Sequence, residues 1–166
     1  MKQWYQIKGN RPLEGAVTIS GAKNAAVAVV PASILAGECC ILENLPCIDD
    51  VNTLKYILCK MGAKATFTPG DCMQIDPTGI NRFSVTFDMV GTLRASYYLL
   101  GALLGRYGYA ELALPGGCVI GPRPIDQHIK GMRALGAEIV LENGIVKATA
   151  KKLKGAEVYF DVVSVG

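Results

Sequence analysis

Apolar residues recur every three or four positions in two segments of the chain, and a glycine follows each segment. This spacing places them on one face of an amphipathic helix, and it predicts helices over residues 50–61 and 126–135. The apolar positions are Val51, Leu54, Leu58 and Met61 in the first segment and Ile125, Ile129, Met132 and Leu135 in the second. We expect Asp50 to cap the start of the first helix, and Gly62 and Gly136 to end the two helices.

Each of these helices lies inside a longer pattern that occurs twice. A first helix and a strand come before it, and two short strands come after it. Asn143-Gly144 in the second copy is a strong signal for a two-residue hairpin turn. The other expected elements are helix 23–36, strand 39–45 and strand 64–67 in the first copy, and helix 94–105, strand 110–114 and strand 138–141 in the second. Two helix-strand-helix-hairpin units therefore cover nearly the whole chain, which predicts a domain assembled from similar units.

The spacing between the two copies changes inside one loop. Their first helices start 71 positions apart, whereas the glycines after their second helices are 74 positions apart. The additional residues fall in segment 115–124, which is rich in glycine and proline and carries Cys118 and Arg123. Because binding and catalytic residues concentrate in loops held by a rigid scaffold, this segment is the first candidate for function.

The last residues of the chain resemble the entry to the first copy. Residues 163–166 read VSVG, and residues 19–22 read ISGA. A third copy therefore starts where the chain ends. We expect the chain to be a truncated piece of a longer protein, or to be completed by another chain.

Composition and charge exclude several classes of protein. The 166 residues are 51% hydrophobic and 19% charged, which suits a globular domain with a sizeable core. The net charge of +3 is scattered without a basic run, and this favours small anionic ligands over nucleic acid. The longest apolar stretch, residues 25–36, is shorter than the roughly 20 residues that span a bilayer, and the first residues lack the apolar core of a secretory signal. We therefore expect a cytoplasmic protein without a membrane span.

The six cysteines are expected to be reduced, because a disulfide framework is typical of short secreted chains with weak cores. Cys39, Cys40 and Cys59 are interpreted as small buried hydrophobic residues. The chain has no Cys-x-x-Cys pair and a single histidine, so no metal site is expected.

Lys23 and Arg94 occupy the same place in the two copies, the first turn of the first helix. A cation there opposes the helix dipole at a cost of up to about 1 kcal/mol, so the placement calls for a reason. One reading is an anion site, where backbone N–H groups and a positive side chain converge on phosphate or carboxylate. The other is that each cation pairs with a surface carboxylate. Asn24 fits either reading, as a hydrogen-bond donor to the anion or as a local cap.

Cys118 follows two glycines in the inserted loop, where flexible backbone leaves a thiol exposed. Arg123 lies five residues on and could lower the pKa of that thiol and hold an anionic substrate. The alternative is that a lone cysteine in a glycine-rich loop is incidental. His128 has two readings as well, a ligand contact near the loop or a surface residue of its helix.

Four motifs in order give these residues a family resemblance. They read SGAKNAA at residues 20–26, LRAS at 93–96, LPGGCVIGPRPID at 114–126 and VSVG at 163–166. Together they resemble the UDP-N-acetylglucosamine 1-carboxyvinyltransferase family, and the likeness runs over essentially the whole chain. The resemblance implies an α/β fold, an inside-out α/β barrel of the enolpyruvyl transferase type, in which each of two domains is built from three βαβαββ units. Residues 1–20 would then be strands of the second domain, and residues 21–166 two repeats of the catalytic-loop domain with the third repeat cut off.

The resemblance also implies roles for particular residues. Cys118 matches the mobile-loop cysteine of the family, which donates a proton and is the target of fosfomycin. Lys23 and Asn24 match residues that bind phosphoenolpyruvate. Where many members have lysine this chain has Val162, so one charge near the uridine diphosphate is absent. The residues that match contacts to UDP-N-acetylglucosamine are Arg94, Arg123, Pro124, Ile125, Asp126, Gln127, Val162, Val163, Ser164 and Val165.

The implied reaction moves the enolpyruvyl group of phosphoenolpyruvate to the 3′-hydroxyl of UDP-N-acetylglucosamine and releases phosphate, the first committed step of peptidoglycan synthesis. It needs an acid near C3 of phosphoenolpyruvate and cations around its phosphate and carboxylate, and it needs no metal or organic cofactor. The expected partners are these two small molecules, with no nucleic acid and no membrane. The family's catalytic aspartate lies beyond residue 166.

Two other readings stay open. The shikimate-pathway enolpyruvyl transferases share the fold and reaction type but lack the Pro-Gly-Gly-Cys loop. The chain could also be a non-catalytic nucleotide-sugar-binding or assembly fragment. Apolar faces that the missing third unit would cover are expected to promote self-association of such a fragment.

Overall fold

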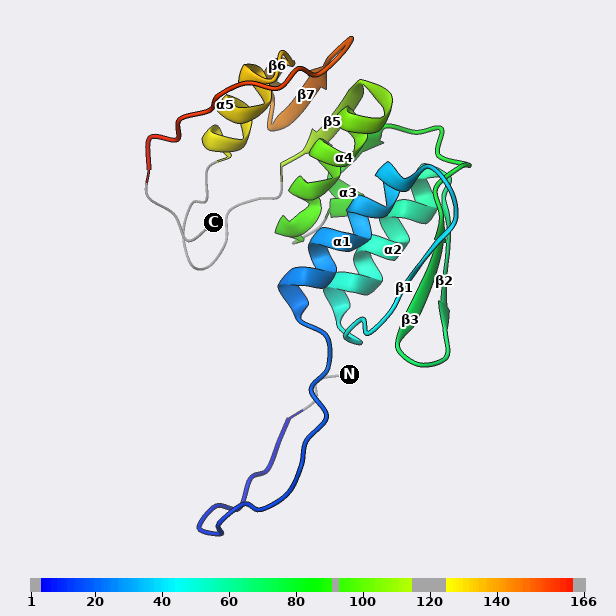
Figure 1. Ribbon diagram of the computed structural model, residues 1–166, viewed down its shortest axis with the longest axis vertical. Coiled ribbons are helices and arrows are strands. Elements are labelled where there is room, and N and C mark those ends of the chain that lie inside the picture. The colour runs from blue at the N-terminus through cyan, green and yellow to red at the C-terminus, as the bar shows by residue number, and fades with distance from the viewer. Residues whose placement is uncertain (1–3, 91–92, 115–124, 163–166) are drawn as a thin grey trace.

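The computed structural model describes residues 4–90, 93–114 and 125–162, including the backbone but not the side chain of Arg94 (Figure 1). The first repeated unit contains two helices, one strand between them and a hairpin, in the predicted order. Its elements are α1 (Lys23–Ala36), β1 (Cys40–Leu42), α2 (Asp49–Met61), β2 (Lys64–Thr68) and β3 (Cys72–Asp76).

The second unit repeats this order and begins with two short elements that sequence analysis did not predict. These are β4 (Ser84–Val85) and α3 (Phe87–Val90). The remaining elements are η1 (Arg94–Ser96), a 3₁₀ turn, followed by α4 (Tyr97–Tyr107), β5 (Tyr109–Ala113), α5 (Asp126–Ala134), β6 (Glu138–Glu142) and β7 (Ile145–Thr149).

The sheet topology confirms the repeat. The first sheet has the order β1-β3-β2 and the second contains β5-β7-β6, so corresponding strands occupy corresponding places. All of these pairs are antiparallel, and β4 adds a parallel strand beside β5. Only the second unit shows the complete βαβαββ order among the described residues, because residues 4–20 contain no regular strand.

The local signals for chain reversal are also confirmed. Gly62 follows α2 with φ 110°, and Gly136 follows α5 with φ 95°, a region that residues with a side chain rarely adopt. The β6–β7 turn has positive φ at both Asn143 and Gly144, 52° and 74°, as a type I′ turn requires. The sequence pattern therefore marked the ends of α2 and α5 and the hairpin turn correctly, whereas the helix expected to end at residue 105 continues to Tyr107.

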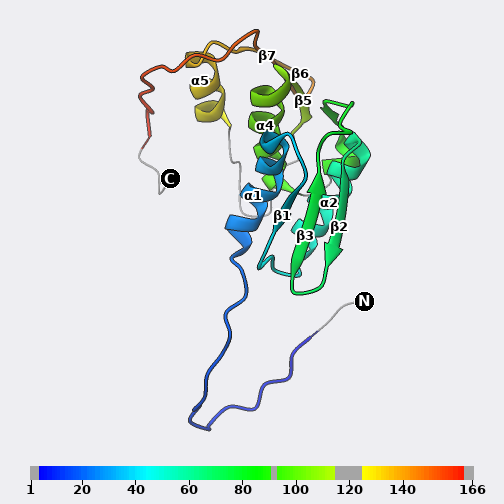
Figure 2. The same cartoon turned by 45° about the vertical axis from the view of Figure 1, so that its right-hand side comes forward.

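The core lies between the helices, and the sheets cover them from outside. Helix α1 packs between α2 and α4, the first sheet lies against α1 and α2, and the second lies against α4 and α5 (Figures 1 and 2). Alternate strand residues face the helices: Met73 and Ile75 of β3 are fully buried, whereas Gln74 between them is exposed. Helices inside and sheets outside are the arrangement expected for an inside-out α/β fold.

Several expected boundaries were wrong. The strand expected over residues 39–45 is limited to β1, because Asn44 adopts φ 54° and the chain leaves the sheet there. Helix α2 starts one residue before the expected cap, with Ile48 at the N-cap and no side-chain cap hydrogen bond, so Asp50 does not cap it. The helix expected from Arg94 begins as the 3₁₀ turn η1 and becomes α-helical only at Tyr97.

The interpretation of three cysteines as buried residues was also wrong. Cys39 and Cys59 are exposed and Cys40 is half-buried. Strand β1 is the edge of its sheet, and Cys59 lies on α2 beside the buried face rather than within it. Hydrophobic spacing along α2 identified the buried positions, and Cys59 falls outside that spacing.

The second helix of the first unit, α2, is more deeply buried than its counterpart in the second unit, α5. Five residues of α2 are buried, but none of the residues of α5 is. The matching apolar residues of α5, Ile129 and Met132, are only partly buried although they pack against the core. Within the described residues, the second unit therefore leaves part of an apolar helix face open, in contrast to the first unit.

Candidate functional site

Lys23 and Asn24 are the first two residues of α1, and both are exposed. The helix starts after Ala22, which has an extended backbone and whose carbonyl accepts a hydrogen bond from the Ala26 N–H at 3.0 Å. Ala22 offers no side-chain cap, so the first turn of α1 presents backbone N–H groups beside a lysine. This is the arrangement that sequence analysis associated with an anion site.

The Lys23 ammonium lies 2.6 Å from the Oδ2 atom of Asp50, in the first turn of α2. This contact is the second of the two readings of Lys23, the pairing with a surface carboxylate. The pair joins the N-terminal turns of two neighbouring helices, and the Lys23 side chain keeps 60% of its surface exposed. Such a pair contributes little to stability, about 0–1 kcal/mol, so an anionic ligand can compete for the lysine.

Arg94 opens the 3₁₀ turn η1 at the N-terminal end of α4. It therefore starts the segment that leads into α4, the helix that corresponds to α1, but with a different local backbone from Lys23. The role expected for its side chain stays a prediction.

Ile125, Asp126 and Gln127 form the start of α5. Ile125 is the N-cap residue and is buried, and its carbonyl accepts a hydrogen bond from the Ile129 N–H at 2.9 Å. Asp126 is exposed, and its Oδ2 atom accepts a hydrogen bond from Gln127 Nε2 at 3.0 Å. An acidic residue in the first turn is favourable there because it complements the positive end of the helix dipole.

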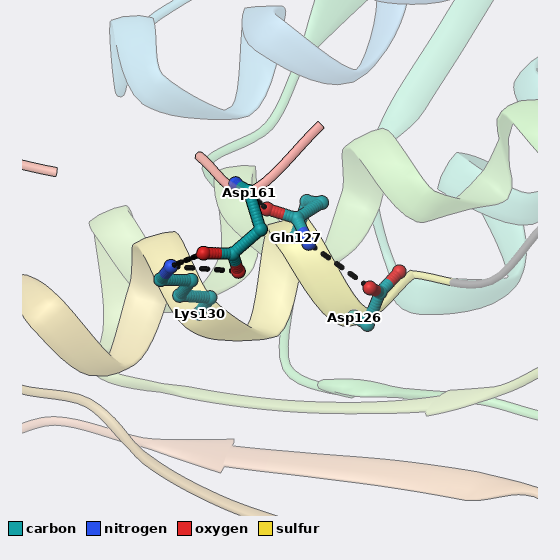
Figure 3. Close-up of polar contacts among 4 residues, drawn as sticks. All are labelled: Asp126, Gln127, Lys130 and Asp161. Atoms are coloured by element: carbon teal, nitrogen blue, oxygen red, sulfur yellow. Dashed lines mark hydrogen bonds and ion pairs between the residues drawn. The ribbon is translucent and has the colours of Figure 1, made fainter. Parts of the chain in front are cut away.

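A segment distant in sequence completes this polar cluster (Figure 3). Lys130 of α5 donates hydrogen bonds to both carboxylate oxygens of Asp161, each at 2.7 Å. The Asp161 backbone N–H donates to Gln127 Oε1 at 3.3 Å. The hydrogen bonds from Lys130 hold the pKa of Asp161 below its ordinary value. Asp126, Gln127, Lys130 and Asp161 are called the α5 cluster below.

An apolar cavity lies beside the α5 cluster, between α4 and α5. Its volume is about 320 Å³, and its lining combines aromatic residues with Gln127 and His128. The His128 ring lies 6.5 Å from the ring of Tyr97, and His128 is exposed. This position agrees with the interpretation of His128 as a surface residue of its helix. The residue also lies next to a cavity that a ligand could reach.

The remaining expected site residues are only partly covered by the structure. Val162 is exposed, with 57% of its surface accessible, directly after Asp161. Cys118, Arg123, Pro124, Val163, Ser164 and Val165 lie outside the described residues. The structure therefore brings together Lys23 with Asp50, and Asp126 and Gln127 with the residue preceding Val162.

Sequence reasoning missed three residues of these contacts. Asp50 had been assigned a capping role, and Lys130 and Asp161 had no role at all. Lys130 follows Gln127 at helical spacing, and Asp161 is adjacent to Val162, so both were neighbours of expected site residues. Their contact with each other was not predictable, because 31 positions separate them.

The described ranges contain neither a candidate metal site nor a candidate membrane-spanning helix. No group of three or more His, Cys, Asp or Glu side chains is placed to hold a metal ion. No helix there has the length and apolar character needed to cross a membrane.

Comparisons with known proteins agree with this fold and these motifs. One relative is UDP-N-acetylglucosamine 1-carboxyvinyltransferase 3 of Caldanaerobacter subterraneus, 51% identical over 162 residues, which are 98% of this chain and 39% of that protein. Another is UDP-N-acetylglucosamine 1-carboxyvinyltransferase 2 of Bacillus subtilis, also 51% identical, over 96% of this chain and 37% of that protein. The chain thus spans about two fifths of the length of these curated relatives.

A solved structure and a family model complete the comparison. The crystal structure of the enolpyruvyl transferase NikO from Streptomyces tendae superposes with a TM-score of 0.71 and 30% identity, over 85% of this chain and 31% of that one. The family model described as EPSP synthase (3-phosphoshikimate 1-carboxyvinyltransferase) matches residues 7–166. With nearly the whole chain matched and the expected fold observed, this chain belongs to the EPSP synthase family.

Proposed function

We propose that this chain supplies the substrate-binding and loop-acid part of an enolpyruvyl transferase that acts on UDP-N-acetylglucosamine. The observation that carries this proposal is the 51% identity, over 96–98% of the chain, with relatives named UDP-N-acetylglucosamine 1-carboxyvinyltransferase. The reaction transfers the enolpyruvyl group of phosphoenolpyruvate to the sugar 3′-hydroxyl and releases phosphate. We place it in the cytoplasm, at the first committed step of peptidoglycan synthesis.

Phosphoenolpyruvate is held at the start of α1 in this proposal. The lack of a side-chain cap on Ala22 and the exposure of Lys23 support an anion site there. Lys23 leaves Asp50 to neutralise charge on phosphoenolpyruvate, and Asn24 donates a hydrogen bond. Lys23 is well suited to this exchange, because an ammonium on a flexible stem can change partner by rotation.

Cys118 is the proposed proton donor. Protonation of phosphoenolpyruvate at C3 makes C2 electrophilic, and the sugar 3′-hydroxyl attacks that carbon. The resulting tetrahedral ketal then loses a C3 proton and phosphate to form the enolpyruvyl product. Arg123 lies close to Cys118 in sequence and stabilises the negative charge of the substrates. The thiol is also the proposed site of modification by fosfomycin.

The nucleotide sugar is held by residues of the second unit. These comprise Arg94 of η1, the segment 123–127 that leads into α5, and the segment 162–165. The contact of Gln127 with the N–H of Asp161 supports this grouping, because it brings the start of α5 to the residue that precedes the second segment. Val162 replaces a family lysine, so this chain is expected to bind the diphosphate with one positive charge fewer.

Two measurements test the proposal. Calorimetry of the chain with UDP-N-acetylglucosamine should give one binding site per chain, and UDP-glucose should bind more weakly because it lacks the N-acetyl group. A phosphate-release assay with both substrates then tests turnover, once the chain is combined with the remaining length that its relatives possess. Absence of binding to the nucleotide sugar would contradict the substrate assignment.

A binding fragment without catalysis is the second candidate. The observation that favours it is length, since the chain spans about two fifths of its curated relatives. The partly open apolar face of α5 further supports self-association of the isolated chain. Binding of UDP-N-acetylglucosamine without phosphate release after reconstitution would favour this candidate.

A further inference from the structure

The segment that follows β7 runs back along α5 and is attached to it at both ends. Near the C-terminal end of α5, the Lys154 N–H donates a hydrogen bond to the Leu135 carbonyl at 2.9 Å. Near the N-terminal end, Asp161 contacts Lys130 and Gln127. Figures 1 and 2 both show this segment, in red, following the helix. Residues 154–161 are called the return segment below.

Between these two attachments the return segment also packs against α5. The Phe160 ring lies next to Gly131. A Cβ atom added to this glycine would be 3.8 Å from the ring, an ordinary van der Waals distance. Phe160 lines the apolar cavity between α4 and α5 together with Tyr97 and Met132. The segment is therefore anchored by one backbone hydrogen bond, one aromatic contact and the α5 cluster.

Within the α5 cluster, both the oxygen and the nitrogen of the Gln127 side-chain amide form hydrogen bonds. Its oxygen accepts the Asp161 N–H, and its nitrogen donates to Asp126. The Lys130 ammonium donates hydrogen bonds to both oxygens of the Asp161 carboxylate. The two side chains keep 40% and 60% of their surface exposed, so the pair adds little to overall stability, as for Lys23 and Asp50. Together these contacts connect the start of α5 to the residue before Val162.

We propose that Lys130 and Asp161 are positioning residues that hold the two nucleotide-sugar segments, 123–127 and 162–165, at a set spacing. Within segment 123–127, Gln127 contributes to nucleotide-sugar binding through this clamp and does not touch the ligand itself. The inference rests on the proposed function for its ligand, UDP-N-acetylglucosamine. The clamp itself is a property of the described residues and can be tested without any ligand. Its effect on binding is indirect, because neither Lys130 nor Asp161 needs to touch the nucleotide sugar.

The ligand-free test measures hydrogen exchange of the Asp161 N–H, which donates to Gln127 Oε1. Lys130→Met keeps the length of the side chain but removes its charge, and it should accelerate exchange of this amide while β6 and β7 stay protected. Asp161→Asn should do the same. The matched control is Lys151→Met, which removes one positive charge just before the return segment and should leave exchange unchanged. Unchanged exchange in both cluster variants would overturn the clamp.

The ligand test compares dissociation constants for UDP-N-acetylglucosamine by calorimetry. Lys130→Met and Asp161→Asn should each weaken binding about fivefold or more, the usual size of coupling between a structural element and a site. The charge exchange Lys130→Asp with Asp161→Lys should recover most of that loss. Equal affinity in the wild type and both single variants would overturn the positioning role.

A double-mutant cycle separates positioning by Gln127 from direct contact. Gln127→Leu keeps the size of the side chain and removes both hydrogen bonds. If Gln127 acts through the clamp, adding Gln127→Leu to Lys130→Met weakens binding little further, because the spacing is already lost. Additive losses would mean that Gln127 contacts the ligand, which would overturn this part of the inference.

These measurements distinguish failure of the clamp from failure of the proposed function. If the wild-type chain does not bind the nucleotide sugar, the proposed function and the ligand-positioning role both fail, whereas hydrogen exchange still decides whether the clamp exists. If the wild type binds but the cluster variants bind equally well, the proposed function stands and the positioning role is wrong.

Discussion

Asp50 is the residue with which an anionic ligand must compete for Lys23. Its Oδ2 atom lies 2.6 Å from the lysine ammonium, and both side chains are accessible to solvent. In this structure the charge at the start of α1 is therefore balanced by the neighbouring helix. Binding of phosphate or carboxylate there requires that this pair opens, so Asp50 tunes the affinity of the proposed phosphoenolpyruvate site.

Replacing Asp50 by asparagine is expected to tighten binding of phosphoenolpyruvate by about fivefold, because one unit charge near a surface cation is worth about 1 kcal/mol in water. Calorimetry measures this effect. Asp49→Asn is the matched control, since it removes one carboxylate from the same first turn of α2, where the structure records no contact with Lys23. Weaker binding in Asp50→Asn would show that Asp50 holds Lys23 in its binding position instead of competing with the ligand.

Cys118 gives a second prediction at the scale of one residue, for the complete enzyme. Cys118→Asp should retain turnover and Cys118→Ser should lose most of it, because the loop needs a proton donor and a serine hydroxyl is too weak an acid. Phosphate release measures turnover, and mass spectrometry should detect fosfomycin on the wild type alone. Equal rates for the serine variant and the wild type would remove Cys118 from the mechanism.

The glycines after α2 and α5 occupy corresponding positions in the two units, but the packing around them differs. Both have positive φ, but of the two only Gly62 is packed so tightly that an added Cβ atom would collide with another residue, at the Gly79 carbonyl oxygen. At Gly136 the nearest atom to such a Cβ is the Lys152 carbonyl oxygen at 3.9 Å. The same signal for the end of a helix therefore carries an additional packing constraint in the first unit.

Gly136→Ala should lower the free energy of unfolding by about 1–2 kcal/mol, the cost of a left-handed conformation for a residue with a Cβ atom. Gly62→Ala should cost about 1–3 kcal/mol more, because backbone must move to relieve the collision. Urea denaturation of the two variants measures the difference. Equal losses would mean that the close approach of Gly62 and Gly79 does not contribute.

The attachment of the return segment to α5 is expected to depend on pH. Hydrogen bonds from Lys130 and charge attraction to it lower the pKa of Asp161 in the folded chain. A lowered carboxyl pKa means that the attachment is fully present above the ordinary aspartate pKa and is lost as pH falls through the lower, folded-state pKa. Among the described residues, Asp126 and His128 of α5 and Tyr97 and Tyr98 of α4 are also titratable groups near this end of α5.

Hydrogen exchange of the Asp161 N–H, followed from neutral to acidic pH and corrected for the intrinsic rate, measures this dependence. Protection should fall only in the acidic range, and in Lys130→Met it should already be low at neutral pH. Protection that falls already near neutral pH would contradict the assignment of this dependence to Asp161.

At the scale of the whole molecule, the two units differ in what covers them. Helix α2 is buried on its apolar face by α1, β2 and α3, whereas α5 has no buried residue and its apolar side chains are only partly covered. Residues 4–20 are exposed throughout and extend away from the helices (Figure 2). Trp4, Tyr5, Ile7, Leu13, Val17 and Ile19 among them each keep at least 80% of their surface exposed. Apolar surface is therefore open at both ends of the described chain.

The isolated 166 residues are expected to release no phosphate from phosphoenolpyruvate, and to self-associate as concentration rises. The reason is that the relatives are more than twice as long, and closure of a second domain around the substrates excludes water from such a reaction. A phosphate assay and sedimentation measure the two outcomes. Turnover proportional to the concentration of the isolated chain, and abolished by Lys23→Ala, would contradict the division of chemistry proposed for the two parts.

The sequence by itself determined the features that depend on neighbouring residues. Helical spacing identified the buried face of α2, positive-φ glycines marked where helices end, and Asn143-Gly144 located a hairpin turn. Each of these signals depends on backbone preference or periodicity within a few positions, so it can be read locally. The repeat could be predicted because the same local signals occur twice in the same order. The family could be predicted because its motifs are contiguous segments of sequence.

Only the tertiary structure decided which distant side chains meet. Asp50 was predicted to cap α2 and instead forms an ion pair with Lys23. Asp161 accepts hydrogen bonds from Lys130, although 31 positions separate the two residues. The partial exposure of Cys40 was decided in the same way, by the place of β1 at a sheet edge. Such contacts depend on how elements pack and where the chain returns, and no local pattern of residues encodes that geometry.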